Sequence, residues 1–285
     1  MVWQELYGNW ILIPPRPVAI IHFLGGAFVA TAPQVTYRGL LEFLANQGYV
    51  IVATPFVNTL DHSTTAQRVM RVSNLALDAL SRDLGHLPIY GIGHSMGCKL
   101  HLLIGSLFPQ ERVGNILISF NNYPAKRSIP MVEQLGQFSK FAAQFANQFA
   151  NQMASQLNTT LPSQFTNQFA ANFEVEFTPS PEETNRLIVE AYQIPYNLLV
   201  KFTNDDIDQT RSLDQALQQR FPDSTTVQIL KGTHLTPLGQ EVSWQAGKEF
   251  TPFDAVGQFL KQELTRDINQ LKRTLLDWLD SPAAA

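Results

Sequence analysis

The stretch Pro88–Phe108, PIYGIGHSMGCKLHLLIGSLF, decides how this chain is interpreted. It opens with a short β-rich run, Pro88–Ile92, continues through GHSMG at 93–97, and ends in an apolar segment, Cys98–Phe108, that Pro109 stops. This pattern predicts a strand, a tight turn and a helix. The two glycines of GHSMG suit such a turn, because a Cβ atom at either position would clash with neighbouring backbone.

Strand-sized apolar runs alternate with helix-length segments on both sides of this stretch. Upstream we expect strands over Trp10–Ile13, Val18–Phe23 and Tyr49–Pro55, and helices over Tyr37–Gln47 and Ser63–Leu84, the latter capped by Ser63 or Thr64. Downstream we expect strands over Asn115–Phe120, Asn197–Phe202 and Thr225–Leu230, and helices over Ser212–Arg220 and within Phe253–Leu279. Near-continuous apolar strands that alternate with helices indicate an α/β fold, with a mostly parallel central sheet covered on both faces.

The segment between the two halves differs from both. Apolar side chains recur every four residues across a stretch without charges, which predicts an amphipathic helix over Phe141–Leu157. We therefore expect residues 1–127 and 194–285 to form the core, and residues 128–193 to be an inserted helical cap.

Composition excludes several classes of function. The chain has 285 residues with 20 basic and 24 acidic side chains, so its net charge of −4 gives no support for nucleic-acid binding. The single cysteine, Cys98, excludes an internal disulfide, and the histidine spacing suggests no metal site or other cofactor. Because neither a signal peptide nor a transmembrane run is visible, we expect a cytoplasmic protein. The sequence does not indicate an oligomeric state.

The GHSMG turn and two later loops together resemble the α/β-hydrolase superfamily, over nearly the whole chain. In that superfamily a serine nucleophile precedes an acid and then a histidine. The resemblance implies that Ser95 is the nucleophile, that Asp205 in the loop NDDID is the acid, and that His234 in KGTH is the base. Asp206 is the alternative acid.

The resemblance also implies an oxyanion hole built from backbone N–H groups. Met96 follows the nucleophile and supplies one donor, and Leu24 or Gly25 in the loop after the Val18–Phe23 strand supplies the other. The stretches HFLGGAF, ATPF, GHSMGCKLH and NDDID look most like an uncharacterised branch of the superfamily in cyanobacteria and plastids, described only as a domain of unknown function.

These features predict a serine hydrolase that cleaves a carboxylic ester through an acyl-enzyme. The apolar stripe of the predicted cap suits a lipophilic small molecule, and the candidate pocket residues are Phe141, Phe145, Phe149 and His94. The stripe leaves peripheral contact with a membrane open, although it lacks the basic residues that attract anionic lipids. Two alternatives also stay open: a hydrolase-fold binding protein without catalysis, and a thioesterase, amidase or lyase that uses the same residues.

Overall fold

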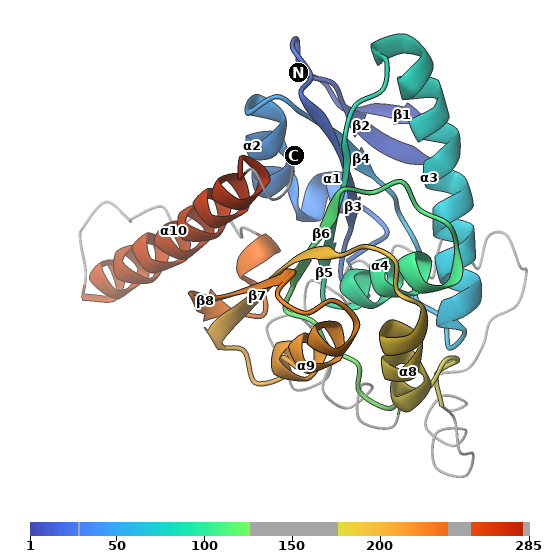
Figure 1. Cartoon of the computed structure of the whole chain (residues 1–285). Helices are drawn as coiled ribbons and strands as arrows, with labels where there is room; N and C mark the ends of the chain where they lie inside the picture. Colours follow the sequence, from blue (N-terminus) through green and yellow to red (C-terminus); the bar gives the residue numbers. More distant parts are fainter. Residues whose placement is uncertain (28, 126–175, 239–251, 282–285) are drawn as a thin grey trace, which may run out of the picture.

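The computed structural model describes residues 1–27, 29–125, 176–238 and 252–281. These residues form one eight-stranded sheet that runs through the middle of the molecule (Figure 1). Its strands are β1 (Gln4–Leu6), β2 (Asn9–Leu12), β3 (Ala19–Leu24), β4 (Tyr49–Ala53), β5 (Ile89–His94), β6 (Gly114–Ile118), β7 (Tyr196–Asn204) and β8 (Thr225–Thr233). No helix among these residues has both the length and the apolar character needed to cross a membrane.

The strand order is β1-β2-β4-β3-β5-β6-β7-β8, and only the pairs β1–β2 and β2–β4 are antiparallel. Every neighbouring pair from β4 to β8 is parallel. The carboxyl ends of β3, β5, β7 and β8 therefore meet at one edge of the sheet, where ligands bind in open α/β folds.

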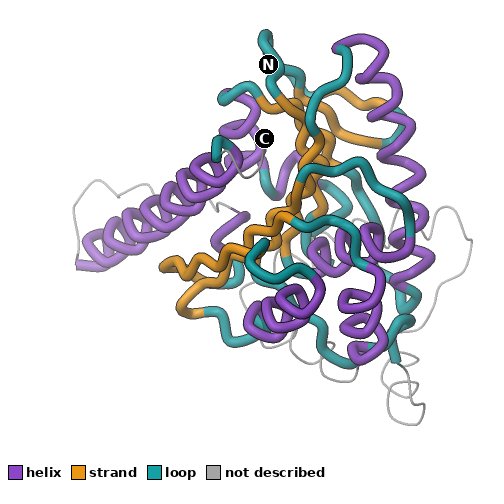
Figure 2. Tube along the Cα trace, viewed as in Figure 1, coloured by secondary structure: helices purple, strands orange, loops and turns teal. Residues whose placement is uncertain are grey.

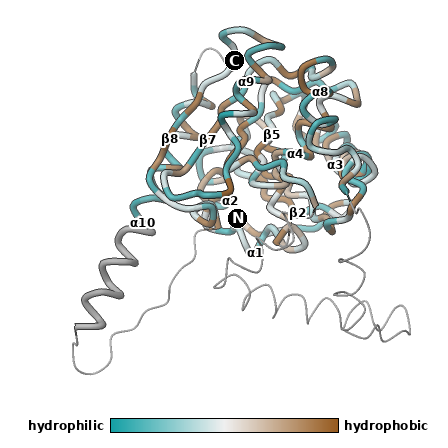
Figure 3. The backbone as a smooth tube through the Cα atoms, turned by 90° about the horizontal axis from the view of Figure 1, so that it is seen from below, coloured by the Kyte–Doolittle hydropathy of each residue, from teal (hydrophilic) through white to brown (hydrophobic). Residues whose placement is uncertain are grey.

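Helices cover both faces of the sheet (Figure 2). They are α1 (Pro33–Thr36), α2 (Arg38–Asn46), α3 (His62–Leu84), α4 (Met96–Leu107), α8 (Pro181–Ala191), α9 (Thr210–Arg220) and α10 (Pro252–Leu279), with a short 3-10 helix η1 at Thr236–Leu238. On one face α3 packs on α4, α4 on α8, and α8 on α9, whereas α10 packs on α2 (Figure 3).

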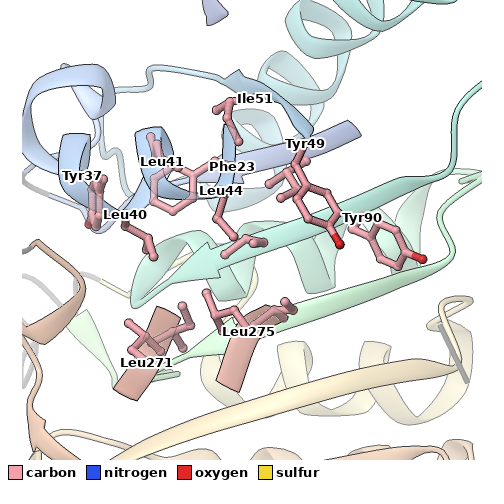
Figure 4. Packing of buried hydrophobic residues seen from close by; sticks show 14 of the residues in the cluster. Phe23, Tyr37, Leu40, Leu41, Leu44, Tyr49, Ile51, Tyr90, Leu271 and Leu275 are labelled. Carbon is pink, nitrogen blue, oxygen red and sulfur yellow. The ribbon is translucent and has the colours of Figure 1, made fainter. Parts of the chain in front are cut away.

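The buried strands alternate between two apolar layers. Ile21 and Phe23 of β3 point into the layer that contains α2 and α10, whereas Ile20 points toward α3. In the first layer, Leu41 and Leu44 of α2 face the sheet together with Leu271 and Leu275 of α10 (Figure 4). Since burying one leucine side chain contributes about 1.5–3 kcal/mol, this layer fixes the sheet on which the loops are mounted.

Helix α8 lies inside the range 128–193 that we expect to be a cap. Ser180 begins it with a capping box, in which its hydroxyl accepts from the Glu183 N–H and the Glu183 carboxylate accepts from the Ser180 N–H. The side chain of Ile188 in α8 is buried in one cluster with Leu102 of α4 and Leu213 of α9. Residues 126–175 lie outside the described residues, so the cap and the helix over Phe141–Leu157 stay predictions.

Helix α3 corrects one local expectation. It begins one residue earlier than predicted, at His62, and its cap is Asp61, whose carboxylate accepts from the Thr64 N–H at 2.8 Å. Asp61 takes this role because its backbone is extended, as an N-cap requires, whereas Ser63 and Thr64 already lie inside the helix.

Candidate active site

Ser95 lies on a strained turn between β5 and α4. Its φ of 55° and ψ of −118° place a non-glycine residue in a region that L-amino acids rarely adopt. The turn needs both flanking glycines: a Cβ atom at Gly93 would lie 2.6 Å from the Cys98 nitrogen, and one at Gly97 would collide with the Leu24 carbonyl. The turn holds the Ser95 hydroxyl at the carboxyl edge of the sheet, ahead of the helix that follows it.

Asp205 and His234 meet across two neighbouring strand ends. Nδ1 of His234 lies 2.9 Å from Oδ2 of Asp205, and both side chains are buried. Burial favours the neutral acid, but the hydrogen bond and the charge interaction with His234 outweigh it, so the pKa of Asp205 lies below its ordinary value. The Ile207 N–H also donates to this carboxylate, at 3.2 Å.

The loop after β3 packs against the first turn of α4. Leu24 ends β3, and the backbone of Gly97 closely approaches the carbonyls of Leu24 and Gly25. N–H groups of a helix's first turn have no partner within the helix. Gly25 is needed here because a Cβ atom would lie 2.7 Å from the ring of Tyr37.

A chain of hydrogen bonds connects this loop to the His234 loop through His94. The Gly26 N–H donates to the Tyr37 hydroxyl at 2.7 Å, and that hydroxyl lies 2.8 Å from Nδ1 of His94, to which it donates because the other ring nitrogen of His94 carries the hydrogen. The Nε2–H of His94 then donates to the backbone carbonyl of His234 at 2.9 Å. His94 is therefore a buried link between two loops, and burial lowers its pKa to about 3, which keeps it neutral.

Sequence reasoning missed two residues at this site. Tyr37 fixes the β3 loop, and Asn121 in the loop after β6 donates its Nδ2–H to Oγ of Ser95 at 3.0 Å. Neither belongs to a local motif, and only the fold brings them to Ser95 and His94. A tyrosine at the start of a predicted helix and an asparagine after a predicted strand do not indicate, from the sequence alone, that they contact His94 and Ser95.

The remaining predicted residues, and the third aspartate of the NDDID loop, lie as follows. Asp206 is exposed, and it is Asp205 that contacts His234. Asp208 pairs with Lys201 at 3.0 Å. The pocket residues predicted on the cap, Phe141, Phe145 and Phe149, lie outside the described residues. In the part of the chain that the structure describes, no cluster of three histidine, cysteine or acidic side chains could hold a metal ion.

Comparison with solved structures identifies the fold. An esterase from Pyrococcus furiosus is 13% identical over 95% of this chain and 84% of that chain, with a TM-score of 0.55. A monoacylglycerol lipase from Paleococcus ferrophilus is 14% identical over 95% and 98% of the two chains, with a TM-score of 0.52. At such identities the likeness shows the fold alone: this is the α/β-hydrolase fold, and the predicted fold class is confirmed.

At the level of sequence the relationship is narrower. No curated protein matches the chain. A family model described as a protein of unknown function, DUF1350, matches residues 2–281, and this chain belongs to that family.

Proposed function

We propose that this protein is a serine hydrolase that cleaves carboxylic esters of small, lipophilic alcohols or acids through an acyl-enzyme on Ser95. One observation carries the proposal: the buried His234–Asp205 pair, 2.9 Å apart, lies at the same sheet edge as a serine on a strained strand-to-helix turn. His94 ties the two parts together, because it precedes Ser95 in the chain and its ring lies 5.0 Å from that of His234.

The proposed reaction proceeds in two halves. Nε2 of His234 takes the proton of Ser95 Oγ while Oγ attacks the carbonyl carbon, and Asp205 holds the tautomer and stabilises the resulting cation. The N–H of Met96, with that of Leu24 or Gly25, receives the oxyanion. His234 then protonates the leaving alcohol. In the second half, water attacks the acyl carbon, His234 takes its proton, and Ser95 leaves with that proton as the acid departs.

The comparisons support an ester as substrate. The solved structures of the same fold include an esterase and a lipase by their own descriptions. The acyl or alkyl preference rests on the apolar stripe predicted for the cap.

A fluorophosphonate probe tests the proposal directly, because it phosphonylates activated serines without requiring the natural substrate. We expect the wild type to be labelled and Ser95→Ala to be silent. Asp205→Asn and Asp206→Asn form a matched pair: the first should slow labelling by up to about 10⁴-fold, by analogy with loss of the orienting acid in other triads, and the second should leave it within twofold.

Three outcomes would count against the proposal. An unlabelled wild type would favour a binding protein that keeps the fold without the chemistry. Labelling on a residue other than Ser95 would remove the assigned nucleophile. In the third outcome, the enzyme is labelled and hydrolyses acyl thioesters or amides but no p-nitrophenyl ester of any chain length. Ser95 would then still be the nucleophile, and the proposed ester substrate would be wrong.

A further inference from the structure

The hydroxyl of Ser95 has a hydrogen-bond partner that the proposed reaction does not use. Nδ2 of Asn121 donates to Ser95 Oγ at 3.0 Å, from the loop that follows β6. This strand is the direct neighbour of β5 in the sheet, so the loop lies beside the turn that carries Ser95. The Ser95 N–H also donates to the carbonyl of Ile118, the last residue of β6.

The loop is fixed on both sides of Asn121. Ser119 adopts a positive φ of 54°, which turns the chain at the end of β6, and its N–H donates to the Val200 carbonyl at 2.8 Å. The Phe120 carbonyl accepts from the Gln209 N–H at 2.7 Å. A residue in a sparsely populated conformation costs roughly 1–3 kcal/mol and persists where its surroundings impose it.

The residue after Asn121 is held by three contacts. The Asn122 N–H donates to the side-chain oxygen of Gln209, and its Nδ2 donates to the Pro181 carbonyl at 2.9 Å and to Oδ1 of Asn185 at 3.3 Å. Asn121 therefore lies between two residues whose positions are fixed by hydrogen bonds. Their partners lie in α8 or, for Gln209, directly before α9, and these contacts hold the Asn121 amide against Ser95.

We propose that Asn121 is a catalytic residue, whose amide N–H stabilises negative charge on Ser95 Oγ itself. This inference rests on the proposed function. Oγ gains negative charge while His234 removes its proton, and it gains charge again when it leaves the acyl carbon in the second half of the reaction. An amide donor suits both moments because it stays neutral and neither gives up nor takes a proton.

The role differs from that of an oxyanion hole, which binds the former carbonyl oxygen of the substrate. It also differs from that of Asp205, which acts on Ser95 only through His234. Hydrogen bonds to a charged oxygen are about twice as strong as neutral ones, so the Asn121 donor stabilises the transition state more than the resting hydroxyl. That difference is what accelerates a reaction.

The test compares Asn121→Ala, Asn121→Asp and the control Asn185→Ala by the second-order rate constant for phosphonylation of Ser95. Asn185→Ala removes one amide that supports the same loop without touching Ser95. The aspartate variant keeps the shape of asparagine and removes the donor. Because the rate constant comes from the time course and not from the amount labelled, a permanently misfolded fraction of a variant does not imitate the effect.

We expect Asn121→Ala to react about 10- to 100-fold more slowly, the range for loss of one hydrogen bond to a charged group. Asn121→Asp should be at least as slow at pH 8, since a carboxylate beside Oγ repels the developing charge. Asn185→Ala should stay within threefold of the wild type. For hydrolysis of a p-nitrophenyl ester, kcat should fall and KM should stay within twofold.

Two results would overturn the inference while the proposed function stands. In one, the wild type is labelled and Asn121→Asp reacts within twofold of it, which would mean that the side chain only fills space. In the other, Asn121→Ala reacts faster than the wild type, which would mean that the amide holds Ser95 in an unproductive orientation. An unlabelled wild type would overturn the proposed function, and the inference with it.

Discussion

Replacing His62 by phenylalanine should make the protein less sensitive to acid. His62 begins α3, its side chain is buried, and its ring stacks on that of Phe177 with 4.3 Å between the ring centroids. Burial, with the nearby charge of Lys99, lowers its pKa from 6.5 to about 3. The folded protein therefore keeps His62 neutral at a pH where the unfolded chain protonates it.

The sign and the size follow from proton linkage. Below pH 6.5 the unfolded state binds more protons than the folded state, so stability falls as the pH falls, by about 1.4 kcal/mol per pH unit for each such histidine. Between pH 7.5 and pH 5.0 His62 therefore costs about 2 kcal/mol. His94, His22 and His101 also have pKa values lowered mainly by burial. These three histidines therefore add to the loss of stability in the same direction.

The pH range separates histidines from carboxylates. The pKa of Asp205 is lowered, so its own contribution to stability is lost only at a pH below the ordinary carboxyl range of about 4. Urea unfolding at pH 7.5, 6.5, 5.5 and 5.0, at constant ionic strength, therefore reports the histidines. Between pH 7.5 and 5.0 the free energy of unfolding of His62→Phe should fall by about 2 kcal/mol less than that of the wild type. His62→Gln should show the same smaller fall, although it should be less stable than the wild type at pH 7.5.

Equal slopes for the wild type and both His62 variants would refute this reasoning, as would a wild-type loss below about 2 kcal/mol over the whole range. The first result would mean that His62 is protonated in the folded state. The second would mean that the buried histidines gain compensating partners or solvent when the solution is acidified.

Three further predictions follow from single contacts. Gly97→Ala should lower the free energy of unfolding by at least about 2 kcal/mol and abolish most fluorophosphonate labelling, because its Cβ would displace the Leu24 carbonyl. As a control, Gly39→Ala in α2 has open space around its Cβ and should raise the free energy of unfolding by up to about 1 kcal/mol. Tyr37→Phe should cost roughly 1–3 kcal/mol for each buried partner left without its bond and should slow labelling. Burial lowers the pKa of Lys99 to about 8, so stability should rise between pH 8 and pH 10, and Lys99→Met should abolish that rise in urea unfolding.

The sequence predicts those parts of the fold and site that local patterns encode. Each of Ser95, Asp205 and His234 directly follows a strand of the parallel part of the sheet, so topology alone brings them to one edge. The pattern GHSMG predicts the strained turn, because backbone contacts require both glycines. Gly93 lies against the backbone of Cys98, and Gly97 lies against the carbonyl of Leu24. Strand and helix positions agree with the predictions to within a few residues for the long, buried elements.

The elements that the sequence analysis omits have weak or misread signals. Strand β1 has three residues at the sheet edge, too few for a periodic pattern. Helix α8 does carry a signal, since Ser180 and Glu183 form a capping box, and its omission came from assigning the whole range 128–193 to the cap. In this helix the capping box alone, Ser180 followed three residues later by Glu183, is a sequence signal for the helix start.

The side chains that organise the site are unpredictable for a different reason. Tyr37 is 57 residues from His94, and His94 is 140 residues from His234, so their hydrogen bonds exist only after the sheet has formed. Yet one bond determines the next: because the His234 carbonyl only accepts, Nε2 of neutral His94 must carry the hydrogen, and Nδ1 must then accept from Tyr37. One neutral histidine thus sets the distance between the β3 loop and the proposed base, which explains why the variable position of the GHSMG turn has a buried polar side chain in this protein.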